Sequence, residues 1–211
     1  MMSEEEYRVP IIGIARHRLA VDGQGVTTLV AFHGCTLHCR YCLNAQCLRA
    51  DGFTRTITPD ELLDEVMIDN LYFLATGGGI TFGGGEPAIR SQFIEDFCRM
   101  APPEWHITLE SALNVDRQHL ERLLPYVHQY IIDIKDINLD IYRRYTGQDN
   151  KRVLNNLQWL LDHEGMADRI VVRVPHIPNY NTGEDVRRTC DCLATLGVTH
   201  IDEFTYQCRN P

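Results

Sequence analysis

The chain has 211 residues, of which 44% are hydrophobic and 23% charged, so it is long enough for one well-buried domain and short for two. Its formal net charge of −9 argues against a general binder of nucleic acid or of anionic membranes, because lysine and arginine make those contacts. The sequence shows neither a signal-peptide pattern nor the roughly 20 consecutive apolar residues of a membrane span. We therefore expect a soluble cytoplasmic protein with a protein or small-molecule partner.

The segment from Val26 to His33 is a continuous apolar and β-branched run, which predicts a buried strand. Three cysteines, Cys35, Cys39 and Cys42, follow it directly, where the strand becomes a loop. Three thiolates can hold three irons of a 4Fe–4S cluster and leave the fourth iron free for another ligand. The spacing thus predicts an incompletely coordinated iron–sulfur cluster at the carboxyl end of the first strand.

Two other interpretations of these three cysteines stay open. Structural zinc sites also use cysteine pairs separated by two residues, but they take four ligands, and Cys190 and Cys192 have the wrong spacing for a second pair. The three could also be unconnected core thiols. The other cysteines fit buried or surface thiols of a reducing compartment, because a chain this rich in regular patterns needs no disulfide framework. These are Cys47, Cys98, Cys190, Cys192 and Cys208, of which Cys47 is close to the three.

A helix is predicted to begin at Thr58-Pro59-Asp60-Glu61, which combines a capping box with proline at the first helical position. Further strands are expected at Gly79–Phe82, His106–Glu110, Tyr130–Ile134, Ile170–Val174 and Ile201–Tyr206. Further helices are expected at Ser91–Met100, Asp116–Leu124, Val153–His163 and Thr182–Leu196. This alternation predicts an α/β fold of parallel strands, either an open partial barrel or a doubly wound sheet. In both, ligands gather beyond the carboxyl ends of the strands.

Several polar or glycine-rich positions fall at these strand ends. Gly83 to Pro87 follow the second strand and can bring backbone groups close to a ligand, although a plain turn is the alternative. Glu110 and Ser111 follow the third strand, Arg173 lies on the fifth and Gln207 follows the sixth. We expect these segments to meet at one site.

Asp133 and Lys135 alternate on the fourth strand, so their side chains face the same side. A lysine that faces inward from an apolar strand needs an anion, because burying an unpaired charge is costly. A bound carboxylate would satisfy it, and so would an ion pair with Asp133 or Glu110. Arg173, on the next predicted strand, also needs an anion, which a ligand or an acidic side chain could supply.

Together these motifs resemble the radical S-adenosylmethionine (SAM) superfamily, whose signature is three cysteines at this spacing with an aromatic residue, here Tyr41, before the last. Within it, the chain looks most like the activating enzymes of glycyl radical enzymes, of the pyruvate formate-lyase activating enzyme type. The matching stretches are Val21-Asp22-Gly23-Gln24-Gly25, Gly84-Gly85-Glu86-Pro87, Ile132-Asp133-Ile134-Lys135, Tyr145-Thr146-Gly147 and Val153-Leu154-Asn155-Asn156-Leu157. We expect residues 1–20 to form an N-terminal extension and first turn, and residues 21–211 to form a single domain.

The resemblance implies a partial (βα)6 barrel with a 4Fe–4S cluster on the three cysteines and SAM on the open iron. It implies that SAM is split to methionine and a 5′-deoxyadenosyl radical, which abstracts hydrogen from a glycine of a large glycyl radical enzyme. No catalytic residue is expected beyond these cofactors. Carried over by position, the SAM contacts are Tyr41, Leu43, Gly84, Gly85, Glu86, Glu110, Ser111, Asp133, Ile134, Lys135, Arg173 and Gln207.

The resemblance implies further partners as well. Asp22 and Gly23 would contact the substrate, and a monovalent cation could bind near Glu110, Ser111 and Asp133. A flavodoxin- or ferredoxin-type reductant and a monomeric state are expected.

Four departures from the family pattern leave the hydrogen donor open. Glu110-Ser111-Ala112-Leu113 replaces the usual Asp-Thr-Asn-Gly, Gln24 replaces a proline, and Leu43 and Gln207 replace histidines. A second hypothesis is therefore a radical SAM enzyme that acts on a peptide or a small molecule. A third, of another class, is a non-catalytic iron–sulfur or zinc-binding module.

Overall fold

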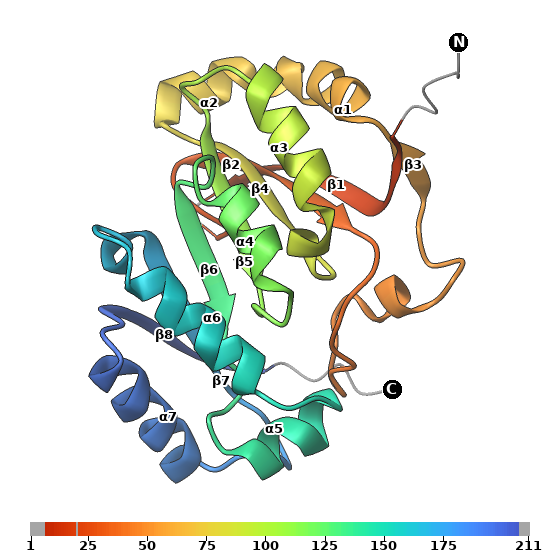
Figure 1. Ribbon diagram of the computed structural model, residues 1–211. Helices are drawn as coiled ribbons and strands as arrows, with labels where there is room; N and C mark the ends of the chain where they lie inside the picture. Colours follow the sequence, from red (N-terminus) through yellow and green to blue (C-terminus); the bar gives the residue numbers. More distant parts are fainter. Residues whose placement is uncertain (1–6, 20, 207–211) are drawn as a thin grey trace.

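One sheet of eight strands organises the structure, a computed structural model that describes residues 7–19 and 21–206 of the chain. The strands are β1 (Val9–Leu19), β2 (Val26–Phe32), β3 (Arg55–Ile57), β4 (Gly79–Gly84), β5 (His106–Ser111), β6 (Gln129–Asp133), β7 (Ile170–His176) and β8 (His200–Thr205). Their order across the sheet is β3-β1-β2-β4-β5-β6-β7-β8 (Figure 1). Within these residues the order ends at β3 on one side and at β8 on the other, so the sheet is open.

Six of the strands run parallel, namely β2 and then β4 to β8. They coincide with the six predicted strands. The connections between them carry α1 (Pro59–Val66), α2 (Asn70–Thr76), α3 (Ser91–Met100), α4 (Arg117–Leu123), α5 (Leu139–Thr146), α6 (Lys151–Leu161) and α7 (Gly183–Thr195). Figure 1 shows α3, α4 and α6 in front of the sheet, covering one of its faces. The arrangement confirms the predicted α/β fold and its open, partial barrel.

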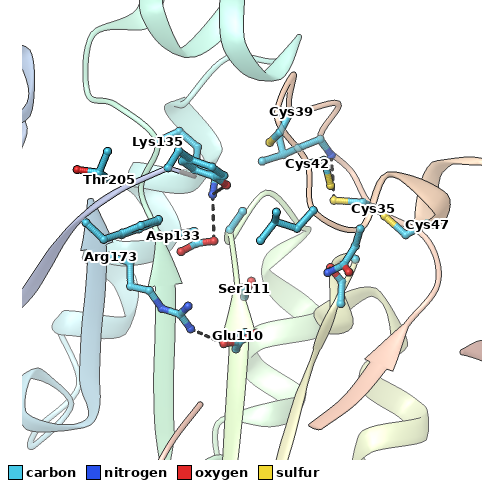
Figure 2. A pocket seen from close by; sticks show the side chains of 18 residues that line it. Cys35, Cys39, Cys42, Cys47, Glu110, Ser111, Asp133, Lys135, Arg173 and Thr205 are labelled. Carbon is cyan, nitrogen blue, oxygen red and sulfur yellow. Dashed lines mark hydrogen bonds and ion pairs between the residues drawn. The ribbon is translucent and has the colours of Figure 1, made fainter. Parts of the chain in front are cut away.

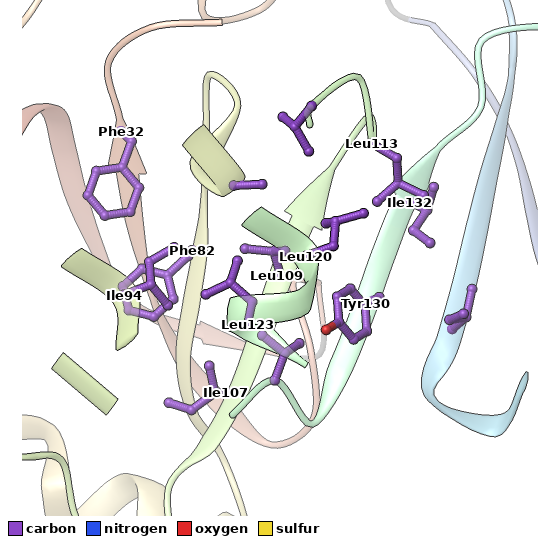
Figure 3. Close-up of a cluster of buried hydrophobic side chains, with 14 of the residues drawn as sticks. Phe32, Phe82, Ile94, Ile107, Leu109, Leu113, Leu120, Leu123, Tyr130 and Ile132 are labelled. Carbon is purple, nitrogen blue, oxygen red and sulfur yellow. The ribbon is translucent and has the colours of Figure 1, made fainter. Parts of the chain in front are cut away.

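The hydrophobic core lies between this outer face of the sheet and the helices. Phe82 of β4, Leu109 of β5 and Ile132 of β6 are fully buried, as are Ile94 of α3 and Leu120 of α4, and Figure 3 shows the five side chains in one layer. Truncating such a side chain to alanine costs about 2–5 kcal/mol. A slip of one residue would turn the apolar side chains to the other face, so this layer fixes the register of the strands.

The same register turns polar side chains to the inner face of the sheet, because successive residues of a strand alternate in direction. Thr81 and Gly83 of β4, Thr108 and Glu110 of β5, and Asp133 of β6 occupy the alternate positions. A Cβ placed on Gly83 would lie 2.7 Å from Glu110 Oε2, so the Glu110 side chain lies over the space that glycine leaves open on this side. The inner face is therefore polar, and it leads toward the carboxyl ends of the strands.

The antiparallel strand β1 was not among the predicted elements. It pairs with β2 on one side and β3 on the other, which brings Val9–Leu19 into the same sheet as the parallel strands. Its pairing with β2 is interrupted between Ile11 and Gly13 and again between Ala15 and Arg18, and His17 has a φ of 56°. These irregularities explain why no regular alternation is visible in the sequence.

The predicted helix start at Thr58 is confirmed. Thr58 Oγ1 accepts a hydrogen bond from the Glu61 backbone N–H at 3.2 Å, and Glu61 Oε2 accepts one from the Thr58 backbone N–H at 3.0 Å. Satisfying these end groups fixes where α1 begins. A search of residues 7–19 and 21–206 finds no helix with the length and apolar character that a membrane span requires.

Candidate active site

A cavity of about 570 Å³ opens at the carboxyl ends of the parallel strands. Its volume is in the range of sites that hold a small molecule or cofactor. Eleven of the residues predicted for the site line it: Cys35, Cys39, Cys42, Leu43, Gly84, Gly85, Glu110, Ser111, Asp133, Lys135 and Arg173 (Figure 2). Segments more than one hundred residues apart in the sequence thus line the same cavity, as the predicted topology implied.

Backbone hydrogen bonds hold the cysteine loop at its start and in its middle. At the strand end, the Gly85 backbone N–H donates to Phe32 O at 2.9 Å and the Glu86 N–H donates to Gly34 O at 2.8 Å. A Cβ on Gly85 would lie only 2.1 Å from Gly34 O, so the close approach of the two backbones requires glycine there. In the middle of the loop, the His38 N–H donates to the carbonyl oxygen of Thr146, the last residue of α5, at 2.9 Å. The glycine-rich turn therefore supports the loop as well as lining the cavity.

The three cysteine sulfurs differ in their surroundings. Burial raises the pKa of Cys39 to about 11. The neighbouring Cys47 side chain lowers the pKa of Cys42 to about 6 and also lowers the pKa of Cys35. The Leu37 backbone N–H also lies 3.5 Å from Cys35 Sγ. These contacts favour thiolates at Cys35 and Cys42, and thiolate is the form that binds metal.

The cavity also contains two ion pairs, one at the end of β6 and one that joins β7 to β5 across β6. Lys135 Nζ lies 3.0 Å from Asp133 Oδ2, and Arg173 is paired with Glu110 (Figure 2). Burial acts to lower the pKa of Lys135, but the charges of Asp133 and of the surrounding Tyr206, Cys39 and Tyr145 together outweigh it, and the pKa lies well above its usual value. Ion pairs within the protein therefore satisfy both inward-facing cations. Asp133 Oδ1 stays buried and without a hydrogen-bond partner among the described residues.

Glu86 lies beneath the cavity wall and is not one of its lining residues. Glu86 is 1% exposed, and its carboxyl group accepts hydrogen bonds from Ser111 Oγ at 2.8 Å and from the Ala112 N–H at 3.0 Å. Burial raises the pKa of Glu86 to about 7 despite these bonds. The side chain braces the end of β5 against the glycine-rich turn and so helps to set the shape of the wall.

Other residues predicted for the site lie outside the cavity lining. The Tyr41 ring packs against Tyr145 and Tyr180, with centroids 6.1 and 5.7 Å away. Ile134 is 1% exposed, and its backbone N–H donates to Arg173 O at 3.0 Å. Gln207 lies outside the described residues.

Asp22 and Gly23 lie farther down the inner face. The Thr81 hydroxyl donates to Asp22 O, and a Cβ on Gly23 would lie 2.7 Å from Thr108 Oγ1. Both threonines stand at earlier positions of their strands than the cavity residues, so this segment sits below the cavity. Its predicted contact with the substrate stays a prediction.

The structure adds lining residues that the sequence did not single out: Leu37, Asn44, Cys47, Ala112, Phe204, Thr205 and Tyr206. Asn44 Nδ2 donates to Gly84 O at 2.9 Å and so ties the cysteine loop to the glycine-rich turn. Nearness to Cys42 was the only signal for Cys47. Tyr206 receives a hydrogen bond from Lys135 Nζ at 3.3 Å, across 71 residues of sequence that no local pattern connects.

Comparison with known proteins places these features in context. The sequence model of the radical SAM superfamily matches residues 29–193 of the chain. A pyruvate formate-lyase-activating enzyme of Staphylococcus aureus is 31% identical over 172 residues, which cover 78% of this chain and 67% of that enzyme.

Two solved structures show the same fold. A domain of a pyruvate-formate lyase-activating enzyme from Bacteroides vulgatus has a TM-score of 0.54 at 22% identity, covering 64% of this chain and 85% of the other. Streptococcus suis SuiB bound to the precursor peptide SuiA has a TM-score of 0.64 at 11% identity, covering 85% of this chain and 38% of SuiB. SuiB has also been solved bound to S-adenosylmethionine.

Proposed function

Because this chain belongs to the radical SAM superfamily and is similar to the pyruvate formate-lyase-activating enzymes, we propose that it activates a glycyl radical enzyme. In this proposal the chain cleaves SAM in the cysteine-lined cavity and takes a hydrogen atom from a glycine of a large partner protein. The superfamily makes it a radical SAM enzyme with a 4Fe–4S cluster, as the cysteine spacing predicted, and with SAM, as the family resemblance implied. The observation that carries the proposal is the meeting of the three cysteines and the glycine-rich turn at one cavity.

The residues present fit a 4Fe–4S cluster. Cys35, Cys39 and Cys42 line one cavity, and the environments of two of them favour thiolate. Among the described residues, no three His, Cys, Asp or Glu side chains converge closely enough to hold one metal ion. A cluster has another requirement, because each thiolate binds an iron of its own and the sulfurs stand farther apart. The described residues therefore offer no site for a single metal ion, and this does not argue against a cluster on the three cysteines.

The opposite wall of the cavity fits the polar groups of SAM. Asp133 Oδ1 is a buried acceptor without a partner among residues 7–19 and 21–206, and it can receive a hydrogen bond from an ammonium or hydroxyl group of a ligand. Gly84 and Gly85 expose backbone on the same lining. Lys135 and Arg173 line the same wall, and each carries further N–H groups that could donate to a ligand carboxylate while its ion pair stays in place. We assign SAM to the space between this wall and the cysteine loop.

The cofactors supply the electron transfer and radical chemistry, and the chain supplies binding, orientation and shelter. Leu37 and Phe204 provide apolar surface in the lining, which keeps water away from reactive groups. The Lys135–Asp133 and Arg173–Glu110 pairs hold their side chains in fixed positions around the ligand. A flavodoxin- or ferredoxin-type reductant, a monomeric state and a cytoplasmic location complete the proposal.

A second candidate keeps the SAM chemistry and changes the hydrogen donor to a peptide or small molecule. It is favoured by the residues that follow β5, where Ala112 lines the cavity and Leu113 is fully buried with a φ of 57°. In the same region Glu110 is paired with Arg173 and the Ser111 hydroxyl donates to Glu86, so two of the three residues expected to hold a monovalent cation already have protein partners. The cation site remains a prediction.

The test is an anaerobic activation assay with candidate glycyl radical enzymes. Reconstituted protein, SAM and a reductant are incubated with the partner, and electron paramagnetic resonance (EPR) is recorded. The proposal expects a new protein radical whose hyperfine splitting changes when the partner is made with deuterated glycine. The Cys39→Ala variant should give none. Formation of 5′-deoxyadenosine without any partner radical, together with modification of a peptide substrate, would favour the second candidate instead.

A further inference from the structure

A group of exposed arginines lies on the outer side of the cysteine loop. Arg40 follows Cys39 directly, and its side chain is exposed, whereas Cys39 lines the cavity. Arg143 and Arg144 occupy the last turn of α5, and both are exposed as well. None of the three arginines is among the lining residues of the cavity. We call Arg40, Arg143 and Arg144 the basic surface.

Backbone hydrogen bonds join the cysteine loop to α5. The Arg40 N–H donates to Tyr145 O at 3.1 Å, and the His38 N–H donates to Thr146 O at 2.9 Å. Figure 1 shows the loop that follows β2 running toward α5. The cluster ligand Cys39 lies between these two anchored residues, and neighbouring Cα atoms are about 3.8 Å apart. The loop is therefore a thin wall with the cavity on one side and the basic surface on the other.

The positive charge of the basic surface is not neutralised locally. No ion pair joins Arg40, Arg143 or Arg144 to a carboxylate within the described part of the chain. Residues 33–48 contain no aspartate or glutamate, and Asp140 of α5 lies in its first turn, at the other end of the helix. The chain as a whole has a formal net charge of −9. A positive surface on an acidic protein attracts an acidic partner to that place.

We propose that the basic surface docks an acidic protein that carries single electrons and that reduces the cluster through the cysteine loop. In this step the carrier is oxidised by one electron and the cluster is reduced by one, and no covalent bond forms or breaks. A carrier in this place leaves the cavity free for SAM and for the hydrogen donor, which must reach the cavity itself. The inference rests on the proposed function for the cluster and its protein reductant, and not on the identity of the hydrogen donor.

The experiment measures electron transfer between the reconstituted full chain and a carrier in the absence of SAM. The chain is reduced with dithionite, freed of the excess, and mixed by stopped flow with an oxidised acidic flavodoxin or an oxidised acidic 2Fe–2S ferredoxin. Transfer in this direction uses the same contact surface as transfer into the cluster, and it requires no catalytic activity. The readout is the second-order rate constant per reducible cluster, recorded as a function of ionic strength.

The test variant is Arg40→Gln/Arg143→Gln, which removes two charges of the basic surface. Arg144 stays in place, because it also donates to Tyr180 O at 2.9 Å and its charge acts on Asp185. The single variant Arg143→Gln leaves the cysteine loop unaltered. It keeps the test informative if the double variant takes up less iron.

The matched control is Arg99→Gln/Arg187→Gln, which removes two exposed arginines from α3 and α7. Two positive charges are lost from each double variant, so the formal net charge of both changes from −9 to −11. The control therefore separates the place of the charges from their sum.

At low salt the test variant should transfer electrons to at least one carrier about tenfold more slowly than the unaltered protein, with a weaker dependence on ionic strength. Arg143→Gln should fall between them, and the control should stay within about twofold of the unaltered protein. Unchanged rate constants with both carriers, or an equal loss in the control, would overturn the proposal. Weaker binding of a glycyl radical enzyme without slower transfer would also overturn it. A failure of SAM cleavage would count against the proposed function instead, because this experiment contains no SAM.

Discussion

Lys135 Nζ and Asp133 Oδ2 form an ion pair at 3.0 Å in which the lysine side chain is 6% exposed and the aspartate side chain 36% exposed. The two residues lie on the same side at the end of β6, as their spacing predicted. The partners differ in access to water, so they do not contribute equally to stability. The lysine depends on its carboxylate, whereas the aspartate can be partly hydrated without its lysine.

Removing each partner in turn should reveal this asymmetry. Asp133→Asn removes the counter-charge of a buried ammonium group and leaves it only neutral acceptors, the amide oxygen and the Tyr206 hydroxyl at 3.3 Å, so we expect a loss of about 3 kcal/mol in the free energy of unfolding. Lys135→Met leaves the better hydrated carboxylate and should cost less. Denaturant unfolding of the cluster-free protein at pH 7 measures both. Equal losses, or a larger loss in Lys135→Met, would show that the lysine does not depend on Asp133.

Glu86 should make stability fall as the pH rises. Its folded-state pKa of about 7 lies above the ordinary value of 4.5, so the folded protein binds more protons than the unfolded chain between these two values. The stabilisation is complete below about pH 4.5 and is lost as the pH rises through 7. One pKa unit corresponds to about 1.4 kcal/mol, which sets an upper limit of about 3 kcal/mol.

The difference in unfolding free energy between the unaltered protein and Glu86→Gln isolates this effect. Glutamine does not titrate, so the variant should gain stability relative to the unaltered protein between pH 5 and pH 7.5. A difference that stays constant over this range would mean that Glu86 does not titrate there.

Two histidines at the amino-terminal ends of β5 and β6 should make stability fall as the pH falls, the opposite of the effect of Glu86. Burial lowers the pKa of His106 and of His128, and His128 Nδ1 accepts a hydrogen bond from the Ile107 backbone N–H at 3.1 Å. Below about pH 6.5 the unfolded chain binds more protons than the folded protein, so this contribution to stability is present above 6.5 and is lost as the pH falls. The double variant His106→Gln/His128→Gln should flatten the acid side of the stability profile. An unchanged acid slope would exclude both histidines as its source.

Gly85 should tolerate no side chain. A Cβ there would lie 2.1 Å from Gly34 O, so Gly85→Ala must separate the glycine-rich turn from the cysteine loop. We expect lower stability and a lower iron content after reconstitution. Gly183→Ala is the matched control, because no atom lies within 4 Å of a Cβ at this first position of α7, and it should be neutral or stabilising by up to about 1 kcal/mol. Full iron content in Gly85→Ala would show that the close approach is dispensable for the cluster.

Local patterns were sufficient to predict the six parallel strands, the capped start of α1 and the limits of α3. They failed where an element is short or irregular. The helix α5 spans only eight residues and carries Arg143 and Arg144 in its last turn, which obscures its apolar face. The strand β1 is interrupted twice in its pairing with β2.

The site residues, too, were predictable where the sequence signal is local and unpredictable where it is not. The spacing of three cysteines within eight residues is a local signal, and it identified the cluster loop. The contacts of Cys47 with Cys35 and Cys42, and of Lys135 with Tyr206, depend on how loops close and on which strands become neighbours. Such contacts arise from tertiary packing and leave no periodic pattern in a single sequence. Tyr41 illustrates the converse, because its motif position is clear while its ring packs among tyrosines outside the cavity lining.

The most direct test of the account is the cleavage of SAM by the anaerobically reconstituted chain. After reduction with dithionite, protein with about four irons and four sulfides per chain should release methionine and 5′-deoxyadenosine in equal amounts, and Cys39→Ala should release neither. A fully loaded, reduced cluster that leaves SAM intact would contradict the assignment of this cavity as a radical SAM site.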